Sequence, residues 1–236
     1  MQLKDFQKDI KRLANPAKAA FLARFFKTGK GEYAEGDKFL GITVPESRSL
    51  AQKYKDLKFP EIKELLTSKL HEERLIALLI LVHNFGKGNA EKQKEIYDFY
   101  LKHTAYINNW DLVDLSADKI VGAYLLDKQR NILLKLAKSK NLWERRIAIV
   151  STYQFIKHKK EYNDTFRIAK ILLYDKHDLI HKAVGWMLRE VGKRAAKEAL
   201  IEFLREHYKT MPRTMLRYSI EHFSVVERRA YIEGKI

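Results

Sequence analysis

The segment from Asn109 to Asp114 (Asn-Trp-Asp-Leu-Val-Asp) combines residue types that can do chemistry. On a helix Trp110 and Asp114, four residues apart, share one side with Asp111, which is three residues before Asp114. The chain has 46 Lys+Arg against 30 Asp+Glu, so an acid pair beside a tryptophan makes the electrostatic potential locally different from that of the rest of the protein. Functional sites tend to occur where the potential is perturbed in this way. A carboxylate there could stabilise a developing cation and orient or deprotonate a water.

The overall charge indicates the kind of partner. The 236 residues have a formal net charge of +16 and a sequence pI of about 9.7, which predicts a polyanionic partner. Nucleic acid is favoured over an anionic membrane surface because no single amphipathic basic segment dominates. The alternative is that the charge serves solubility alone.

Composition also excludes several classes of function. The absence of cysteine excludes disulfide and thiolate chemistry and suits a reducing compartment. The longest apolar run, residues 75–82, is far shorter than the roughly 20 residues of a membrane helix. The N-terminus alternates charged and apolar residues and lacks the apolar core of a signal peptide. We expect a cytoplasmic, monomeric protein with no membrane partner, nucleoid-associated if the source is bacterial.

The elements that must position these residues are predicted to be helices throughout. Pro16, Pro45 and Pro60 each precede a run with helical periodicity, a position that suits the fixed φ of proline. No convincing series of alternating strands occurs, and the main loop signal is the glycine-rich stretch 29–37.

A repeat of about 35 residues organises the helices. Ala77, Ala148 and Ala183 occupy similar short motifs and are separated by 71 and 35 residues, and the same step reaches Val113 and Tyr218. This period fits two antiparallel helices per unit. We therefore predict an all-α fold: a HEAT-like helical repeat solenoid (α-α superhelix), C-shaped with a basic concave groove, forming one domain over residues 1–236.

The second helices of successive pairs would face that groove. It would collect basic and aromatic side chains, with arginines suited to phosphates and flat rings to deoxyribose or bases. The residues expected there are Trp110, Asp111, Asp114, Arg146, Trp186, Arg189, Arg213 and Arg217.

Six segments between about residues 15 and 223 form a set of motifs in order and at suitable spacing. Three of them are residues 109–114, 143–148 and 182–190, and the other three are Phe39-Leu40-Gly41-Ile42, Pro45-Glu46-Ser47-Arg48 and Pro212-Arg213-Thr214-Met215-Leu216-Arg217-Tyr218. The first three look like the signature segments, and the others like further segments, of the AlkD-like DNA alkylation-repair glycosylases, a family of HEAT-like repeat DNA glycosylases.

The resemblance implies a C-shaped stack of HEAT-like repeats. It also implies base excision repair, in which a monofunctional alkylpurine DNA glycosylase hydrolyses the N-glycosidic bond of cationic N3- or N7-alkylated purines in double-stranded DNA. No metal and no cofactor is implied. A purine alkylated at these positions already carries positive charge and leaves as a neutral base, so a general acid is unnecessary.

The family's roles are carried over by resemblance to matching positions. Asp114 resembles the catalytic carboxylate, and Trp110 and Trp186 resemble the tryptophans that flank it. Arg146 and Arg189 resemble contacts to the DNA backbone, while Arg213 and Arg217 lie in the late family segment. Phe25 departs from the pattern because the family often has tyrosine there. A ring could still pack against the lesion, but a hydroxyl hydrogen bond is lost.

Each assignment has an alternative based on structure alone. Trp110 could fill the core, and Asp111 could cap its helix or interact with the helix dipole. Arg146 and Arg189 could pair with Glu144 or Glu190 on a solvated surface. The whole protein could also bind distorted or branched DNA without catalysis, on the same scaffold, or act as a protein-binding scaffold.

Overall fold

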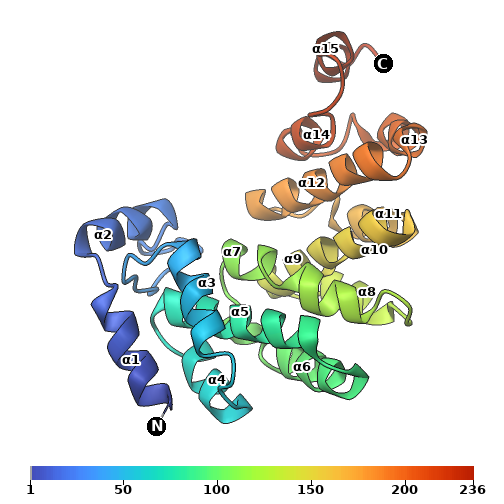
Figure 1. The fold of residues 1–236 in the computed structure, drawn as a ribbon. Coiled ribbons are helices and arrows are strands. Elements are labelled where there is room, and N and C mark those ends of the chain that lie inside the picture. Colours follow the sequence, from blue (N-terminus) through green and yellow to red (C-terminus); the bar gives the residue numbers. More distant parts are fainter. Residues whose placement is uncertain (1) are drawn as a thin grey trace. The chain divides into compact units, whose positions relative to one another are not determined.

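The computed structural model describes residues 2–236 as an all-helical chain (Figure 1). In this range no strand forms, and extended pairing is limited to one isolated bridge between Lys38 and Leu70. The predicted all-α, helical-repeat class is therefore confirmed. No helix between residues 2 and 236 is long and apolar enough to cross a membrane.

The chain divides into two compact units, one ending at Ser116 and the other spanning Ala117–Ile236. The single domain over residues 1–236, the C shape and the basic concave groove stay predictions.

The first unit is built around α5, whose residues from Leu75 to Leu81 are all buried. A helix that is apolar on every side must be covered on every side, and α5 packs against α3, α4 and α6. The helices of this unit are α1 (Gln2–Arg12), α2 (Pro16–Phe25), α3 (Val44–Lys53), α4 (Phe59–Leu66), α5 (His71–Lys87), α6 (Ala90–Lys102), the 3₁₀ turn η1 (Thr104–Tyr106) and α7 (Trp110–Asp114).

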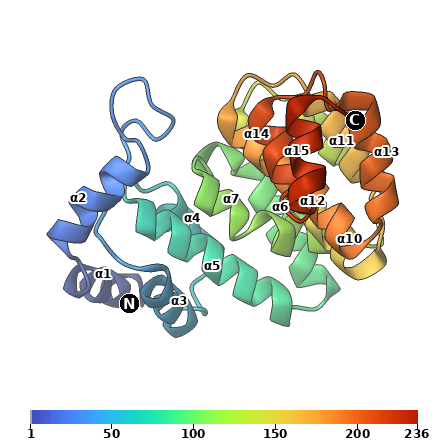
Figure 2. The same cartoon turned by 90° about the horizontal axis from the view of Figure 1, so that it is seen from above.

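The second unit is built around α12, which packs against α9, α11, α13 and α14. Figure 2 shows α12 and α14 side by side, viewed from above. The elements of this unit are the π-helical turn η2 (Asp118–Gly122), α8 (Asn131–Ala137), α9 (Leu142–Ser151), α10 (Tyr153–Lys159), α11 (Asn163–Leu172), α12 (Asp178–Arg194), α13 (Lys197–His207), α14 (Arg213–Ser219) and α15 (Val225–Glu233).

The 35-residue register corresponds to the helices as they form. Its five positions fall in α5, α7, α9, α12 and α14, one in each. Four of them, Ala77, Val113, Ala148 and Ala183, are completely buried, whereas Tyr218 is 36% exposed. The register thus marks the buried face of a repeated helix, and a small or branched side chain lets its neighbour approach.

The proline and loop predictions are also confirmed. Pro16 is the first residue of α2, and Pro45 and Pro60 are the second residues of α3 and α4. The stretch 29–37 forms turns and bends between α2 and α3.

The helices α12 and α14 of the second unit approach each other closely at Gly185. A Cβ atom added to Gly185 of α12 would lie 2.5 Å from the Cβ of Tyr218 and 2.6 Å from the carbonyl oxygen of Met215. Gly86 of α5 provides a contrast, because a Cβ there would have no neighbour within 4 Å.

We predict opposite effects for two glycine-to-alanine substitutions. Gly185→Ala should lower the free energy of unfolding by about 1–3 kcal/mol, the cost of overpacking a tight interface. Gly86→Ala should raise it by about 0.5–1 kcal/mol, because alanine is the better helix former. Urea denaturation followed by circular dichroism measures both. Equal signs for the two variants would contradict the close approach of α12 and α14.

Candidate active site

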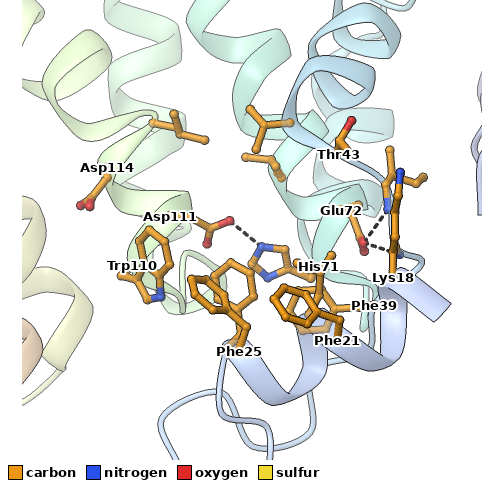
Figure 3. Close-up of a pocket in the computed structure, with 17 residues that line it drawn as sticks. Lys18, Phe21, Phe25, Phe39, Thr43, His71, Glu72, Trp110, Asp111 and Asp114 are labelled. Carbon is orange, nitrogen blue, oxygen red and sulfur yellow. Dashed lines mark hydrogen bonds and ion pairs between the residues drawn. The ribbon is translucent and has the colours of Figure 1, made fainter. Parts of the chain in front are cut away.

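A pocket of about 490 Å³ opens in the first unit, between α2, the segment 39–44, the first turns of α5 and α7 (Figure 3). Its walls are mainly aromatic and aliphatic. The aromatic rings that line it are those of Phe21, Phe25, Phe26, Phe39, His71 and Trp110, and the carboxylates are those of Glu72, Asp111 and Asp114. Three predicted site residues, Phe25, Trp110 and Asp114, are therefore brought together.

Trp110 is a half-buried wall of this pocket. Its ring stacks on Phe26, with centroids 5.2 Å apart and planes 23° apart, and its Nε1–H donates to the hydroxyl of Tyr33 at 3.3 Å. Phe25 meets it edge to face at 6.1 Å and is itself 55% exposed. Trp110 therefore packs against its neighbours and lines the pocket at the same time.

The two acids of α7 have different surroundings. Asp111 is 7% exposed; its Oδ2 lies 2.8 Å from Nε2 of His71, and its Oδ1 accepts from the Leu112 amide at 2.9 Å. Asp114 is half-buried and lines the pocket, and in Figure 3 its carboxylate extends from α7 away from His71. The capping residue of α7 is Asn109, whose side chain accepts from the Trp110 amide. Of the two roles left open for Asp111, capping therefore belongs to its neighbour.

A buried ionic cluster joins α5, α7 and the loop before Phe39. His71 Nδ1 lies 3.5 Å from Asp37 Oδ2, and Arg74 is paired with the same oxygen at 2.7 Å. Phe26 and Phe39 also face the imidazole, with ring centroids 5.0 and 4.6 Å away. Two carboxylates, one guanidinium and two phenyl rings therefore surround His71.

This environment sets the charge of the cluster. Burial would lower the pKa of His71, but the charge and hydrogen bond of Asp111, together with Asp37, raise that pKa to about 9. Burial would likewise raise the pKa of Asp37, but the bond with His71 and the charge of Arg74 hold it below its usual range. His71 is an imidazolium at neutral pH as a result.

Glu72 fixes the neighbouring segment of the pocket wall. Its carboxylate accepts hydrogen bonds from the amides of Leu40, Gly41 and Ile42 at 2.8–3.2 Å. Gly41 has φ of +82°, and a Cβ there would lie 2.2 Å from the carbonyl oxygen of Asn15. The backbone passes so close to the start of α2 that glycine is required, and this explains the Phe39–Ile42 motif noted in the sequence.

Two other predicted site residues lie on α9 and α12 of the second unit. Trp186 is half-buried, and its ring centroid is 6.4 Å from that of Tyr153. Arg146 is 5% exposed and donates to the carbonyl of Leu179, so its guanidinium has a structural partner.

The remaining predicted arginines differ in their pairing. Arg189 forms ion pairs with Glu190 at 3.2 Å and with Glu221. The alternative pairing with Glu190 therefore occurs in this structure, but Glu190 is buried and does not lie on a solvated surface. Arg213 and Arg217 are both exposed on α14, and Arg213 donates to the carbonyl of Ile232 at 2.7 Å. Their roles as DNA contacts stay predictions.

The residues that sequence reasoning missed are Asp37, His71, Glu72 and Arg74. The amides that donate to Glu72 lie 30–32 residues before it, and Asp111 lies 40 residues after His71. No motif spacing indicates such pairs. The available signal was the density of charge at residues 71–74, at the start of an otherwise apolar helix.

The protein is thus a basic, all-helical chain whose pocket combines aromatic rings with carboxylates. The chain matches the family model described as DNA alkylation repair enzyme over residues 6–223 and belongs to that family. The predicted family is thus confirmed.

The fold agrees with a solved structure. One described as a predicted DNA alkylation repair enzyme from Enterococcus faecalis aligns with a TM-score of 0.68 at 18% identity, covering 90% of this chain and 97% of that one. This similarity shows a shared fold. The comparison with curated proteins gave no match.

The charge of His71 predicts a pH-dependent stability. Its folded pKa of about 9 lies above the unfolded value of 6.5, so its contribution is complete below pH 6.5 and is lost as pH rises through 9. The total is roughly 3 kcal/mol, from about 1.4 kcal/mol for each pKa unit. Urea denaturation at pH 6.5 and 9.5 should show this loss in the wild type and not in His71→Gln.

The control for this prediction is His83→Gln, which removes a half-buried histidine from the same helix. It should keep the pH dependence of the wild type. An equal loss of stability between pH 6.5 and 9.5 in His71→Gln and the wild type would show that His71 is not the group responsible.

Proposed function

We propose that this protein is a monofunctional DNA glycosylase that hydrolyses the N-glycosidic bond of cationic N3- or N7-alkylated purines in duplex DNA. The observation that carries the proposal is the position of Asp114: it lines an aromatic pocket together with Trp110 and Phe25. Membership of the DNA alkylation repair enzyme family supports the same reading.

The proposed reaction requires an ionised carboxylate and does not require a general acid. The alkylated purine leaves as a neutral base, and the sugar left behind develops oxocarbenium character as the bond breaks. Asp114 would stabilise that cation and orient or deprotonate the attacking water. A strongly basic protein would otherwise raise the energy of a cation, so the negative charge must be close to the sugar.

The aromatic wall supports the same substrate. Trp110 is held by Phe26 and Tyr33, so its ring is a fixed surface against which the sugar or a cationic base can pack. Phe25 and Phe21 are exposed at 55% and 58% and stack on each other at 6.2 Å. Exposed rings beside a carboxylate suit a flat cation, because the ring face attracts positive charge.

Contacts to the DNA backbone are proposed to come from the basic surface. The net charge of +16 favours binding to a polyanion. Among the predicted arginines, exposure favours Arg213 and Arg217 for direct phosphate contact. Arg146 donates instead to the main-chain carbonyl of Leu179 in α12.

Substitution of the central carboxylate tests the proposal. Asp114→Asn should lower the release of 7-methylguanine and 3-methyladenine from methylated duplex DNA on the order of 100-fold or more. DNA binding should be kept or strengthened, because one negative charge near the phosphates is removed. Single-turnover base release and a fluorescence-anisotropy titration measure the two effects.

The matched control is Asp98→Asn, which removes an exposed carboxylate from α6 and should leave base release unchanged. A wild-type protein that binds DNA tightly and releases neither base would instead support the non-catalytic binder. Full activity in Asp114→Asn would remove this residue from the mechanism.

Phe25 gives a second test. Phe25→Ala should lower kcat/KM by about tenfold through loss of its ring contacts, whereas Phe25→Tyr should stay within about threefold because the ring is kept. Tyr174→Ala is the control, since it removes a ring that is 71% exposed outside the pocket. If both alanine variants match the wild type, the Phe25 ring takes no part in the reaction.

A further inference from the structure

We propose that His71, hydrogen-bonded to Asp111 from the first turn of α5, is a positioning residue that fixes α7 so that Trp110 and Asp114 keep their places in the pocket. The catalytic part of this inference rests on the proposed glycosylase function. His71 would act through Asp111 and not touch the substrate itself.

The helix that carries the site cannot hold its own position. α7 has five residues, Trp110–Asp114, far fewer than an isolated helix needs to be stable in water. Its first turn is held by local bonds, from the Trp110 amide to Asn109 and from the Leu112 amide to Asp111. Two hydrogen bonds between side chains join this turn to distant residues: the 2.8 Å contact of Asp111 with His71 and the 3.3 Å bond from Trp110 Nε1 to the hydroxyl of Tyr33.

His71 is itself firmly fixed. Its amide donates to the carbonyl of Lys38 at 2.8 Å, and Asp37 lies on the far side of its ring. The imidazole, Phe26 and Phe39 form a cluster in which each pair of ring centroids is 4.6–5.1 Å apart. Figure 3 shows the imidazole beside Phe39, with its bond directed at Asp111. An anchor held by ring contacts and charges can transmit its position to its partner.

The same cluster reaches α7 a second time. Phe26 contacts the His71 ring at 5.0 Å and the Trp110 ring at 5.2 Å. α7 is therefore held by hydrogen bonds at Asp111 and Trp110 and by the stacking of the Trp110 ring on Phe26. Asp114 is one turn further along, so a shift of the first turn moves its carboxylate. Shifts of about 1 Å at a catalytic group can cost on the order of 100-fold in rate.

Three variants separate the features of the anchor. His71→Phe keeps a flat ring in the cluster but loses both N–H donors, whereas His71→Gln keeps an N–H that can reach Asp111. Asp111→Asn keeps an acceptor for the Leu112 amide and removes the charge pairing. Native-state hydrogen exchange is followed at two backbone amides, that of Val113 within α7 and that of Leu115 directly after the helix. The reference is the Tyr54 amide, which is bonded to Leu50 at the end of α3.

For His71→Phe we expect exchange at Val113 and Leu115 to rise about tenfold more than at Tyr54, the factor expected when a bond to a charged group is lost. Turnover should fall by about tenfold or more with KM within about twofold, because the reacting groups are displaced while DNA contacts persist. His71→Gln should recover part of both effects. If His71→Phe does not fold, Asp111→Asn is expected to show the same pattern.

The two proposals fail in different ways. Uniform exchange across α3 and α7 in a folded variant would overturn the positioning role, and so would unchanged turnover despite faster exchange at α7. A wild-type protein that releases no base would refute the proposed glycosylase activity. The exchange data would still decide whether His71 fixes α7.

Discussion

The hydrogen-bonded ion pair between His71 and Asp111 is the constraint on which the pocket depends. It joins the first turn of α5, the buried central helix of the first unit, to a helix of five residues that carries Trp110 and Asp114. Such a pair is costly to bury, and it is tolerated where further bonds satisfy both partners. Here the Leu112 amide donates a second hydrogen bond to Asp111. Asp37 lies beside the other nitrogen of His71 and is also paired with Arg74.

The start of α5 organises two walls with adjacent side chains. His71 extends to α7, whereas Glu72 binds three consecutive amides of the segment 40–42. The Leu40 carbonyl of that segment in turn accepts a hydrogen bond from the Asn15 amide, and this bond fixes the start of α2. The exposed rings of Phe21 and Phe25 lie further along α2. One turn of a rigid helix thereby positions both the aromatic and the acidic side of the pocket.

The features that could be predicted from the sequence are local ones. Pro16, Pro45 and Pro60 mark helix starts because the φ of proline is restricted wherever it occurs. The 35-residue register reports a face that is buried at four of its five positions. The conjunction of Trp110 and Asp114 also follows from spacing along one helix. Membership of the family extended these local signals to the function.

The state of individual charged groups could not be predicted in this way. Arg146 and Arg189 have the same side chain and similar sequence surroundings. Arg146 is nevertheless buried and donates to a main-chain carbonyl, whereas Arg189 is paired with two carboxylates. The difference depends on Leu179, which is 33 residues from Arg146, and on Glu221, which is 32 residues from Arg189. Pairings over such distances depend on how successive helices pack, and periodicity does not report them.

The acids in and around the pocket differ in the groups that stabilise their negative charge. The charge of Asp37 is opposed by Arg74, that of Glu72 by three amides and that of Asp111 by an imidazolium, so these three acids hold the wall together. Asp114 is the carboxylate whose direction in the pocket differs, since it extends from α7 away from His71. The charges of Asp37 and Asp111 are balanced by Arg74 and the imidazolium, and the Glu72 carboxylate is solvated by amides, so under the proposed function Asp114 is the acid that would act on a bound cation. Under the proposed function, a protein with a net charge of +16 would attract DNA through its positive charge and present the Asp114 carboxylate locally to a cationic substrate.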